Sequence, residues 1–269
     1  MSKTILITGS TDGIGLATAR MLVNNGHRVL LHGRSGAKLR KAEQEISAGA
    51  DKSRTEGYLA DLSRMSEVEA LAEAVAKKHK SLDVLINNAG VFAAPETVTQ
   101  DGLDVRFAVN TIAPYLLTQR LLPLLGTTGR VINLSSAAQS SVNLKALAGQ
   151  GRRLSDNAAY AQSKLALTMW SRSLAQSLKD KGPVIIAVNP GSLLATKMVK
   201  DAYGVAGSDI GIGAEILVRA ATDKSFASAT GKYFDNDQGQ FAPPYPDALD
   251  MTKSNSLVQE IEAILANSS

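Results

Sequence analysis

The chain has 269 residues, of which 44% are hydrophobic and 20% charged, so it is long enough for one large α/β domain with a buried core. The net charge is only +4 and aromatic residues make up 4%, which argues against a nucleic-acid-binding module. There is no cysteine, so disulfides, thiolate catalysis and Cys-ligated metals are excluded, and the three histidines stand apart without metal-ligand spacing, so we expect no metal site.

Short runs of β-branched and aliphatic residues alternate with longer helical patterns along the chain. In order they predict a strand at 4–8, a helix at 15–26, a strand at 28–33, a helix at 37–49, a strand at 55–60, a helix at 66–79, a strand and turn at 83–90, a helix at 103–126, a strand at 129–136, a helix at 157–180, a strand at 183–191, a helix at 211–222 and a strand at 231–236. Pro114 and Pro123 are expected to kink or end the long helix at 103–126 locally. The Pro-rich segment 241–250 is expected to run irregularly over the surface.

This alternation predicts an α/β fold of one domain over residues 1–269. Strands joined by helices long enough for right-handed crossovers give a Rossmann-type, doubly wound parallel sheet, here of about seven strands, with helices on both faces. The stretches 137–157 and 192–210 lack a regular element and follow the carboxyl ends of strands. Ligands bind at that edge of such sheets, so we expect both stretches to be substrate loops.

Three glycines, Gly9, Gly13 and Gly15, separate the first strand from the first helix. A tight turn at this place needs positive φ, and a pyrophosphate approaches the backbone more closely where no Cβ is present. The helix N-terminus adds free N–H groups and a partial positive charge. The loop therefore predicts a dinucleotide site, against the alternative of a merely tight strand–helix turn. It is not a Walker loop, because no Lys-Ser/Thr pair follows the glycines.

The end of the second strand bears on which dinucleotide is bound. A carboxylate for the ribose hydroxyls is expected there, but the sequence has His32, Gly33, Arg34 and Ser35. Arg34 can pair with a 2′-phosphate through two hydrogen bonds. This favours NADP(H) over NAD(H), the alternative being that Arg34 is simply a solvated loop arginine.

Tyr160 and Lys164 are four residues apart on a predicted helix and therefore share one face. A nearby ammonium favours the phenolate and lowers the pKa of a tyrosine from its ordinary ~10, although the same spacing also suits a surface pair. Ser135 and Ser136 end a strand, and Asn110 stands inside a long helix, where asparagine is a mediocre helix former. Together these residues indicate catalytic chemistry at the sheet edge.

The chain resembles the short-chain dehydrogenase/reductase family over nearly its whole length. The resemblance rests on seven segments in order: 8–15 (TGSTDGIG), 61–62 (DL), 87–90 (NNAG), Asn110, 133–136 (NLSS), 160–164 (YAQSK) and 189–191 (NPG). The gap of 24 residues between Ser136 and Tyr160 is longer than in many family members and is similar to that of the retinol-dehydrogenase-like branch. The light-dependent protochlorophyllide reductases also have a long loop there, but they use a cysteine that this chain lacks.

The resemblance implies roles for four catalytic residues. Tyr160 would be the general acid in carbonyl reduction and the base in alcohol oxidation, while Lys164 would lower the tyrosine pKa and hydrogen-bond the nicotinamide ribose. Ser136 would hold the substrate oxygen, and Asn110 would support a water-linked proton path behind Lys164.

The resemblance also implies a coenzyme site. Its expected residues are Gly9, Ser10, Thr11, Asp12, Gly13, Ile14, Gly15, Arg34, Ser35, Asp61, Leu62, Asn87, Asn88, Ala89, Gly90, Tyr160, Lys164, Pro190, Gly191, Leu193 and Thr196. Asp61 and Leu62 would lie beside the adenine, and Pro190 and Gly191 would face the nicotinamide. The threonine usually found shortly after Pro-Gly comes one position late, at Thr196.

We therefore predict an NADP(H)-dependent oxidoreductase that transfers hydride between nicotinamide and a small to medium, hydrophobic carbonyl or alcohol substrate. An apolar lid over that substrate, or only the packing of a loop, is suggested by Leu193, Leu194, Met198, Val199 and Tyr203. The alternative function is a catalytically idle NADP(H)-binding sensor or scaffold, which needs the glycine loop but not the Ser–Tyr–Lys set.

The expected partner is a small molecule. No run approaches the ~18 apolar residues of a membrane helix, so we expect no membrane span, and the lack of cysteine suits a reducing, cytoplasmic location. Relatives often pair through their two long helices, which leaves a homodimer, a homotetramer and a monomer open.

Overall fold

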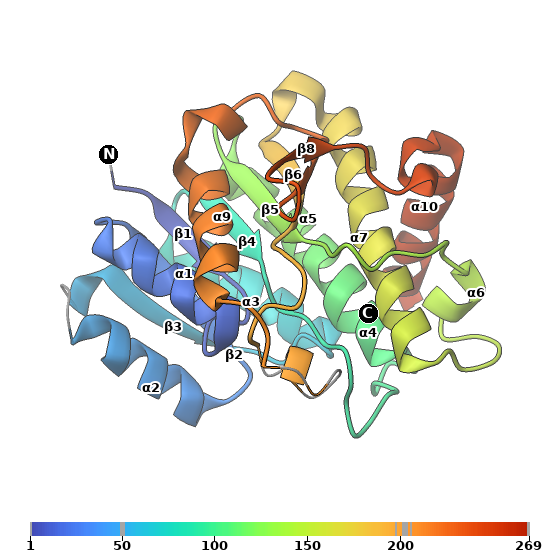
Figure 1. Ribbon diagram of the computed structural model, residues 1–269, viewed down its shortest axis with the longest axis horizontal. Helices are drawn as coiled ribbons and strands as arrows, with labels where there is room; N and C mark the ends of the chain where they lie inside the picture. The colour runs from blue at the N-terminus through green and yellow to red at the C-terminus, as the bar shows by residue number, and fades with distance from the viewer. Residues whose placement is uncertain (1, 49–51, 197, 201–203, 205, 268–269) are drawn as a thin grey trace.

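The structure is a computed structural model that describes residues 2–48, 52–196, 198–200, 204 and 206–267. Eight strands form one sheet in the order β3-β2-β1-β4-β5-β6-β7-β8 (Figure 1). The strands are β1 Thr4–Ile7, β2 Arg28–Gly33, β3 Thr55–Leu59, β4 Val84–Asn87, β5 Arg130–Leu134, β6 Val184–Asn189, β7 Tyr233–Asp235 and β8 Gln240–Ala242. All neighbours are parallel except β7 and β8. The strand order reverses between β1 and β4, so the predicted doubly wound α/β fold is confirmed.

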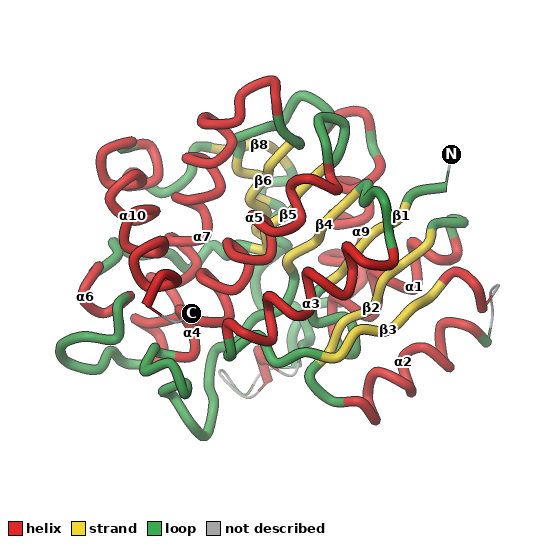
Figure 2. The backbone as a smooth tube through the Cα atoms, turned by 180° about the vertical axis from the view of Figure 1, so that it is seen from behind, coloured by secondary structure: helices red, strands yellow, loops and turns green. Residues whose placement is uncertain are grey.

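Helices cover both faces of this sheet. They are α1 Gly13–Asn24, α2 Gly36–Ser47, α3 Met65–Lys78, α4 Val105–Phe107, α5 Ala113–Leu125, α6 Leu144–Leu147, α7 Asp156–Leu178, α9 Ile210–Thr222 and α10 Met251–Asn267. In Figure 1 α1, α2 and α9 lie in front of the sheet, and Figure 2 shows α3 in front of the opposite face. In the described part of the chain, no helix is at once long enough and apolar enough to cross a bilayer.

Side-chain alternation along the strands divides the core into two halves. Ile5 and Ile7 of β1 pack with the helices of one face, whereas Leu6 between them packs with the helices of the other. All three are fully buried. Successive side chains of a strand point to opposite faces of the sheet, and helices cover both faces. The strand sequences are therefore continuous apolar runs.

The C-terminal part of the chain differs from the sequence-based expectation. The segment 241–250 was expected to be irregular, but Gln240–Ala242 forms β8, an antiparallel edge strand too short to show a period. Helix α10 was not predicted, although Leu257, Ile261 and Ile264 are spaced for one helical face and are buried. This helix packs along α7.

The predicted helix at 103–126 consists of three successive parts: α4, a π-helical turn over Ala108–Ile112, and α5. Pro114 has no N–H to offer to the carbonyl of Asn110 four residues earlier, and the helix widens at that point. Pro123 lies in the last turn of α5 without ending it.

Both stretches predicted to lack regular structure contain short helices. The first, 137–157, includes α6, and residues 198–200 of the second are helical. The end of the first stretch is fixed by Arg106, whose side chain is almost completely buried and donates to Asp104 and Asp156, both at 2.6 Å. Because Asp156 begins α7, this ion pair fixes the helix that carries Tyr160 and Lys164.

Candidate active site

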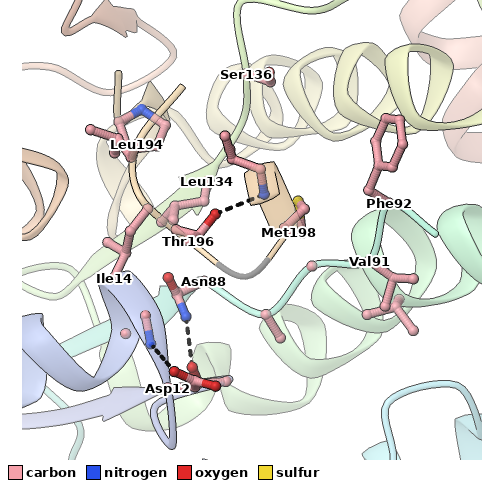
Figure 3. Close-up of a pocket in the computed structure, with 18 of the residues that line it drawn as sticks. Asp12, Ile14, Asn88, Val91, Phe92, Leu134, Ser136, Leu194, Thr196 and Met198 are labelled. Atoms are coloured by element: carbon pink, nitrogen blue, oxygen red, sulfur yellow. Dashed lines mark hydrogen bonds between the residues drawn. The ribbon is translucent and has the colours of Figure 1, made fainter. Parts of the chain in front are cut away.

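The carboxyl ends of β1 to β6 surround one cavity of about 800 Å³ (Figure 3). Its walls come from residues that end or follow each of these strands and from the segment after β6. This is the sheet edge at which a ligand was expected.

The glycine loop forms one wall of the cavity. Gly13 has φ 54°, and a Cβ there would meet, among the described residues, only the Thr196 methyl at 3.7 Å, so its backbone faces open space. Gly15 is glycine for another reason: a Cβ there would lie 2.4 Å from both the Gly9 carbonyl oxygen and Asn88 Nδ2. Of these glycines, Gly13 leaves room for a ligand, whereas Gly15 permits packing within the protein.

Two side chains brace the glycine loop from neighbouring strands. Asn88, after β4, donates through Nδ2 to the carbonyls of Thr8 and Gly9 at 2.8 and 3.0 Å. His32 in β2 accepts the Gly9 N–H at Nδ1, and its Nε2 lies 3.1 Å from the Ala60 carbonyl, to which it donates. Burial lowers the pKa of His32 to about 4, so the ring is neutral at physiological pH and can make both bonds. The isolated histidine of the sequence is thus part of the loop's support.

The adenine end of the expected coenzyme site carries two cationic side chains. Arg34 lines the cavity, as expected, and so does Lys38 in the first turn of α2, which was not predicted. Lys38 Nζ lies 3.7 Å from Asp12 Oδ2, and Asp12 in turn caps α1 by accepting the Gly13 N–H at 2.8 Å. Lys38 lies four residues after Arg34, at the start of the helix that follows it. This spacing was the signal in the sequence that Lys38 could lie near Arg34.

At the other end of the cavity, α7 presents Tyr160 and Lys164. Lys164 is 4% exposed, and its Nζ donates to the Leu134 carbonyl at 2.7 Å. Burial lowers the pKa of Lys164 to about 8. Its Nζ also lies 5.7 Å from the centre of the Tyr160 ring, and the rings of Tyr160 and Phe92 are 5.2 Å apart between their centres.

The two serines after β5 have different surroundings. Ser135 is buried, and its hydroxyl is engaged with Thr168 at 2.8 Å. Ser136 is partly exposed in the cavity wall, and its carbonyl accepts from Gln139 Nε2 at 2.8 Å and from the Tyr233 hydroxyl at 3.2 Å. The Ser136 hydroxyl oxygen accepts the Ala138 N–H at 3.1 Å, which leaves the hydroxyl hydrogen to be donated to a ligand in the cavity.

Asn110 lies in the π-helical turn, behind the cavity wall. Its Oδ1 accepts the Val91 N–H at 2.8 Å, and its Nδ2 donates to the Val91 carbonyl at 2.9 Å and to Ser163 Oγ at 3.0 Å. The amide thus joins the segment after β4 to α7. Asn110 therefore braces this part of the cavity wall, and any part in a proton path stays a prediction.

The segment after β6 crosses the cavity. Thr196 reaches the glycine loop at Gly13, and Met198 Cε lies 3.8 Å from where a Cβ of Gly90 would be. Pro190, Gly191, Leu193 and Val199 also line the cavity, and Leu194 is buried in its wall. Tyr203 lies outside the described residues.

Three expected coenzyme residues do not reach the cavity. The Ser10 hydroxyl is engaged with the backbone of His32, and the Ser35 hydroxyl caps α2. Asn87 is 4% exposed, and its Nδ2 donates to Thr118 Oγ1 and Asn133 Oδ1 inside the core. Because strand residues alternate between faces, a motif residue next to the ligand edge can point into the core instead.

The other coenzyme residues expected from the sequence all line the cavity, together with residues that were not predicted. Those that follow a strand end within five residues are Ala60, Val91, Phe92, Ala137, Ala138 and Ser192; Leu134 and Asn189 end strands, and Val109 comes from the π-helical turn. Their place at the carboxyl ends of strands was the available signal. Val109 had none, because its approach depends on how the helix packs.

Comparison with known proteins gives consistent matches. Residues 3–207 match the model of the family described as short chain dehydrogenase. Human retinol dehydrogenase 13 is 30% identical over 268 residues, covering 92% of this chain and 80% of that protein. A crystal structure of an uncharacterized protein from Mycobacterium paratuberculosis is 29% identical, with a TM-score of 0.81 and coverage of 97% of this chain and 92% of that one. A metagenomic short-chain oxidoreductase solved in complex with NADP is 32% identical, with a TM-score of 0.64 and coverage of 85% and 96%.

Proposed function

Since the chain belongs to the short-chain dehydrogenase family, we propose that it is an NADP(H)-dependent oxidoreductase that interconverts an apolar carbonyl compound and its alcohol. One observation carries the proposal: a single cavity has the glycine loop and Arg34 at one end and Ser136, Tyr160 and Lys164 at the other. A protein that only binds the coenzyme needs the first end but not the second.

The residues present fit a dinucleotide. The Gly13 backbone faces open space at the N-terminus of α1, where N–H groups and the helix dipole favour a pyrophosphate. The cavity of about 800 Å³ extends from there to Lys164. When bound, NADP(H) supplies or takes up the hydride.

The protein's own residues would handle the proton and the charge on the substrate oxygen. Ser136 and Tyr160 would donate hydrogen bonds to that oxygen as negative charge develops on it, and Tyr160 would then deliver its proton. The Lys164 ammonium, 5.7 Å from the tyrosine ring, stabilises the phenolate that remains. In the oxidative direction the same phenolate would take the proton from the alcohol.

Replacing Tyr160 with phenylalanine tests this assignment. The variant should bind NADPH with an unchanged Kd, measured by fluorescence titration, while kcat falls by about 10²-fold or more, because the proton donor is lost. Turnover equal to that of the wild type would refute the mechanism. A wild-type protein that binds NADPH but reduces no member of a broad carbonyl panel would instead favour the binding protein without catalysis.

Arg34 and Lys38 support the preference for NADP(H). Both line the cavity at the adenine end, where a 2′-phosphate would find two cationic donors. Removing both side chains by Arg34→Ala and Lys38→Ala should raise the Kd of NADPH by about 10²-fold, from hydrogen bonds to charged groups, and leave that of NADH nearly unchanged. Equal wild-type affinity for NADPH and NADH would show that the preference is absent.

The wall next to Tyr160 supports an apolar substrate. Val91, Phe92, Val109 and Met198 gather at this end of the cavity. For a series of straight-chain ketones, kcat/KM should rise by about fourfold for each added methylene that the wall buries. A series with no dependence on chain length would argue against the apolar substrate.

A further inference from the structure

The turn between β7 and β8 contacts the cavity wall although none of its residues belongs to a recognised motif. Asp235 ends β7, and Asn236 and Asp237 begin the turn. Asn236 Nδ2 donates to the Pro190 carbonyl at 2.9 Å, and its own N–H donates to the Asn189 carbonyl at 3.1 Å. The turn therefore holds the backbone of the segment that leaves β6.

Asp237 makes the densest set of these contacts. Its Oδ1 accepts the Ser192 N–H at 2.8 Å, and its Oδ2 accepts the Ser192 hydroxyl at 2.6 Å and Asn189 Nδ2 at 2.9 Å. Burial raises the pKa of the Asp237 carboxyl, but the hydrogen bonds from Ser192 and Asn189 outweigh it and hold the pKa below its ordinary value. One carboxylate thus takes three donors from two residues of the cavity wall.

The chain changes direction immediately after this attachment. Leu193 has φ 49°, a left-handed conformation that is unfavourable for leucine. Leu194 then forms an isolated parallel bridge with Ser208, and the Ala195 N–H donates to the Ser208 carbonyl at 2.7 Å. An unfavourable backbone of this kind persists only where its surroundings fix it on both sides. Asp237 provides the fixation on the first side.

Beyond that turn the segment lies across the cavity. Thr196 is on the side of Ile14 and the glycine loop, and Met198 is on the side of Phe92 (Figure 3). The threonine comes one residue later than the pattern expected after Pro-Gly, and the left-handed turn at Leu193 lies between the attachment and Thr196. The path of the chain between Ser192 and Thr196 therefore decides what covers the Lys164 end of the cavity.

We propose that Asp237 is a positioning residue of the coenzyme site, which holds Asn189 and Ser192 so that the following segment covers the nicotinamide end. The proposal rests on the proposed function, because it assumes that a nicotinamide occupies this end. Asp237 acts through Ser192 and Asn189 and contacts neither coenzyme nor substrate. Its effect is thus confined to ligands that reach the nicotinamide end of the cavity.

Two ligands separate this effect from a general loss of structure. NADPH occupies both ends of the cavity, whereas adenosine 2′,5′-bisphosphate carries the adenine and the 2′-phosphate but no nicotinamide. Asp237→Ala should raise the Kd of NADPH by about tenfold, through loss of hydrogen bonds to a charged group, and leave that of adenosine 2′,5′-bisphosphate within about twofold of the wild type.

Asp237→Asn should have an intermediate effect, because its Oδ1 can still accept the Ser192 N–H while its Nδ2 would face other donors. Gln240→Ala, in β8 of the same hairpin and outside the cavity lining, is the matched control and should change neither Kd, because the Gln240 side chain bonds to Gln238.

The outcomes distinguish the two proposals. If the wild type binds adenosine 2′,5′-bisphosphate and NADPH and Asp237→Ala binds both as tightly, the positioning role is wrong while the proposed function stands. If Asp237→Ala weakens both ligands equally, its role is general stability, and the positioning role is again wrong. If Asp237→Ala fails to fold, Asp237→Asn and Ser192→Ala decide between the same results. A wild type that binds neither ligand overturns the proposed function and this inference with it.

Discussion

Replacing Lys164 with methionine should abolish turnover and yet stabilise the folded protein at neutral pH. The lysine is 4% exposed, its Nζ donates to the Leu134 carbonyl, and burial lowers its pKa. A buried ammonium without a neighbouring carboxylate costs folding free energy that a methionine of similar length does not. The site would thus carry a stability cost for its catalytic cation.

The size of the effect follows from the pKa. A fall from 10.5 to about 8 corresponds to about 3 kcal/mol of unfolding free energy, at about 1.4 kcal/mol for each pH unit. Methionine also removes the hydrogen bond to Leu134, which offsets about 1 kcal/mol of the gain. The variant should therefore be about 2 kcal/mol more stable than the wild type at pH 7.

The pH dependence has a definite sign. The pKa of Lys164 is lower in the folded than in the unfolded chain, so between pH 8 and 10.5 the unfolded chain binds more protons and wild-type stability rises with pH. Below about pH 8 both states are protonated, and the full cost of the buried charge is present. The advantage of the methionine variant should therefore be constant below pH 8 and disappear as the pH approaches 10.5.

Urea unfolding followed by fluorescence measures this difference, since Trp170 is the one tryptophan of the sequence and is fully buried. Curves for the wild type and Lys164→Met at pH 7, 8, 9 and 10 should converge with rising pH. Lys77→Met, at an exposed position of α3, is the matched control and should show no such trend. A methionine variant that is less stable than the wild type at pH 7, or a difference that does not change with pH, would refute the reasoning.

Three further substitutions test how the site is supported. Tyr233→Phe removes the hydroxyl that donates to the Ser136 carbonyl, so kcat should fall by about fivefold while the Kd of NADPH stays unchanged. Steady-state kinetics measures kcat and fluorescence titration measures the Kd, and an unaltered kcat would contradict the prediction. Arg106→Met removes a buried guanidinium that bonds to Asp104 and to the half-exposed Asp156 and should lower the unfolding free energy by about 2–3 kcal/mol in urea, whereas a loss below about 1 kcal/mol would show these bonds to be unimportant. Lys179, directly after α7, has a left-handed backbone with φ 48°, which glycine adopts without strain. Lys179→Gly should therefore stabilise the protein by about 1 kcal/mol and raise Tm by about 2 °C. A lower Tm would count against strain at this residue.

The parts of the site that could be predicted from the sequence are those set by local structure. The glycine loop lies between a strand and a helix that are adjacent in the chain, and Tyr160 and Lys164 lie one helical turn apart. Such relations depend on the period of the element and on its ends, both of which the sequence displays. The fold followed in the same way, because buried parallel strands alternate with helices.

Other features of the site could not be predicted, because they depend on which way a single side chain points and on contacts between residues far apart in the sequence. Asn87 belongs to the same four-residue motif as Asn88, yet it points into the core while Asn88 braces the glycine loop. His32 has no recognisable spacing to another residue, and its function appears only when β2 is placed beside the loop after β1. Helix α10 shows that a plain periodic signal can also be missed when it lies beyond the last recognised motif.

The two ends of the cavity are held in different ways, and this decides where substitutions should act. The adenine end is braced within the first half of the chain, by Asn88 and His32 on the loop at Gly9. The end with Tyr160 and Lys164 depends on the last third of the chain, because the Tyr233 hydroxyl donates to the Ser136 carbonyl and the Asp237 carboxylate accepts the Ser192 N–H. Both of these residues lie beyond position 207, where the family match ends. Substitutions in the chain after β6 should therefore change substrate selection and turnover more than they change the affinity for the adenine half of the coenzyme.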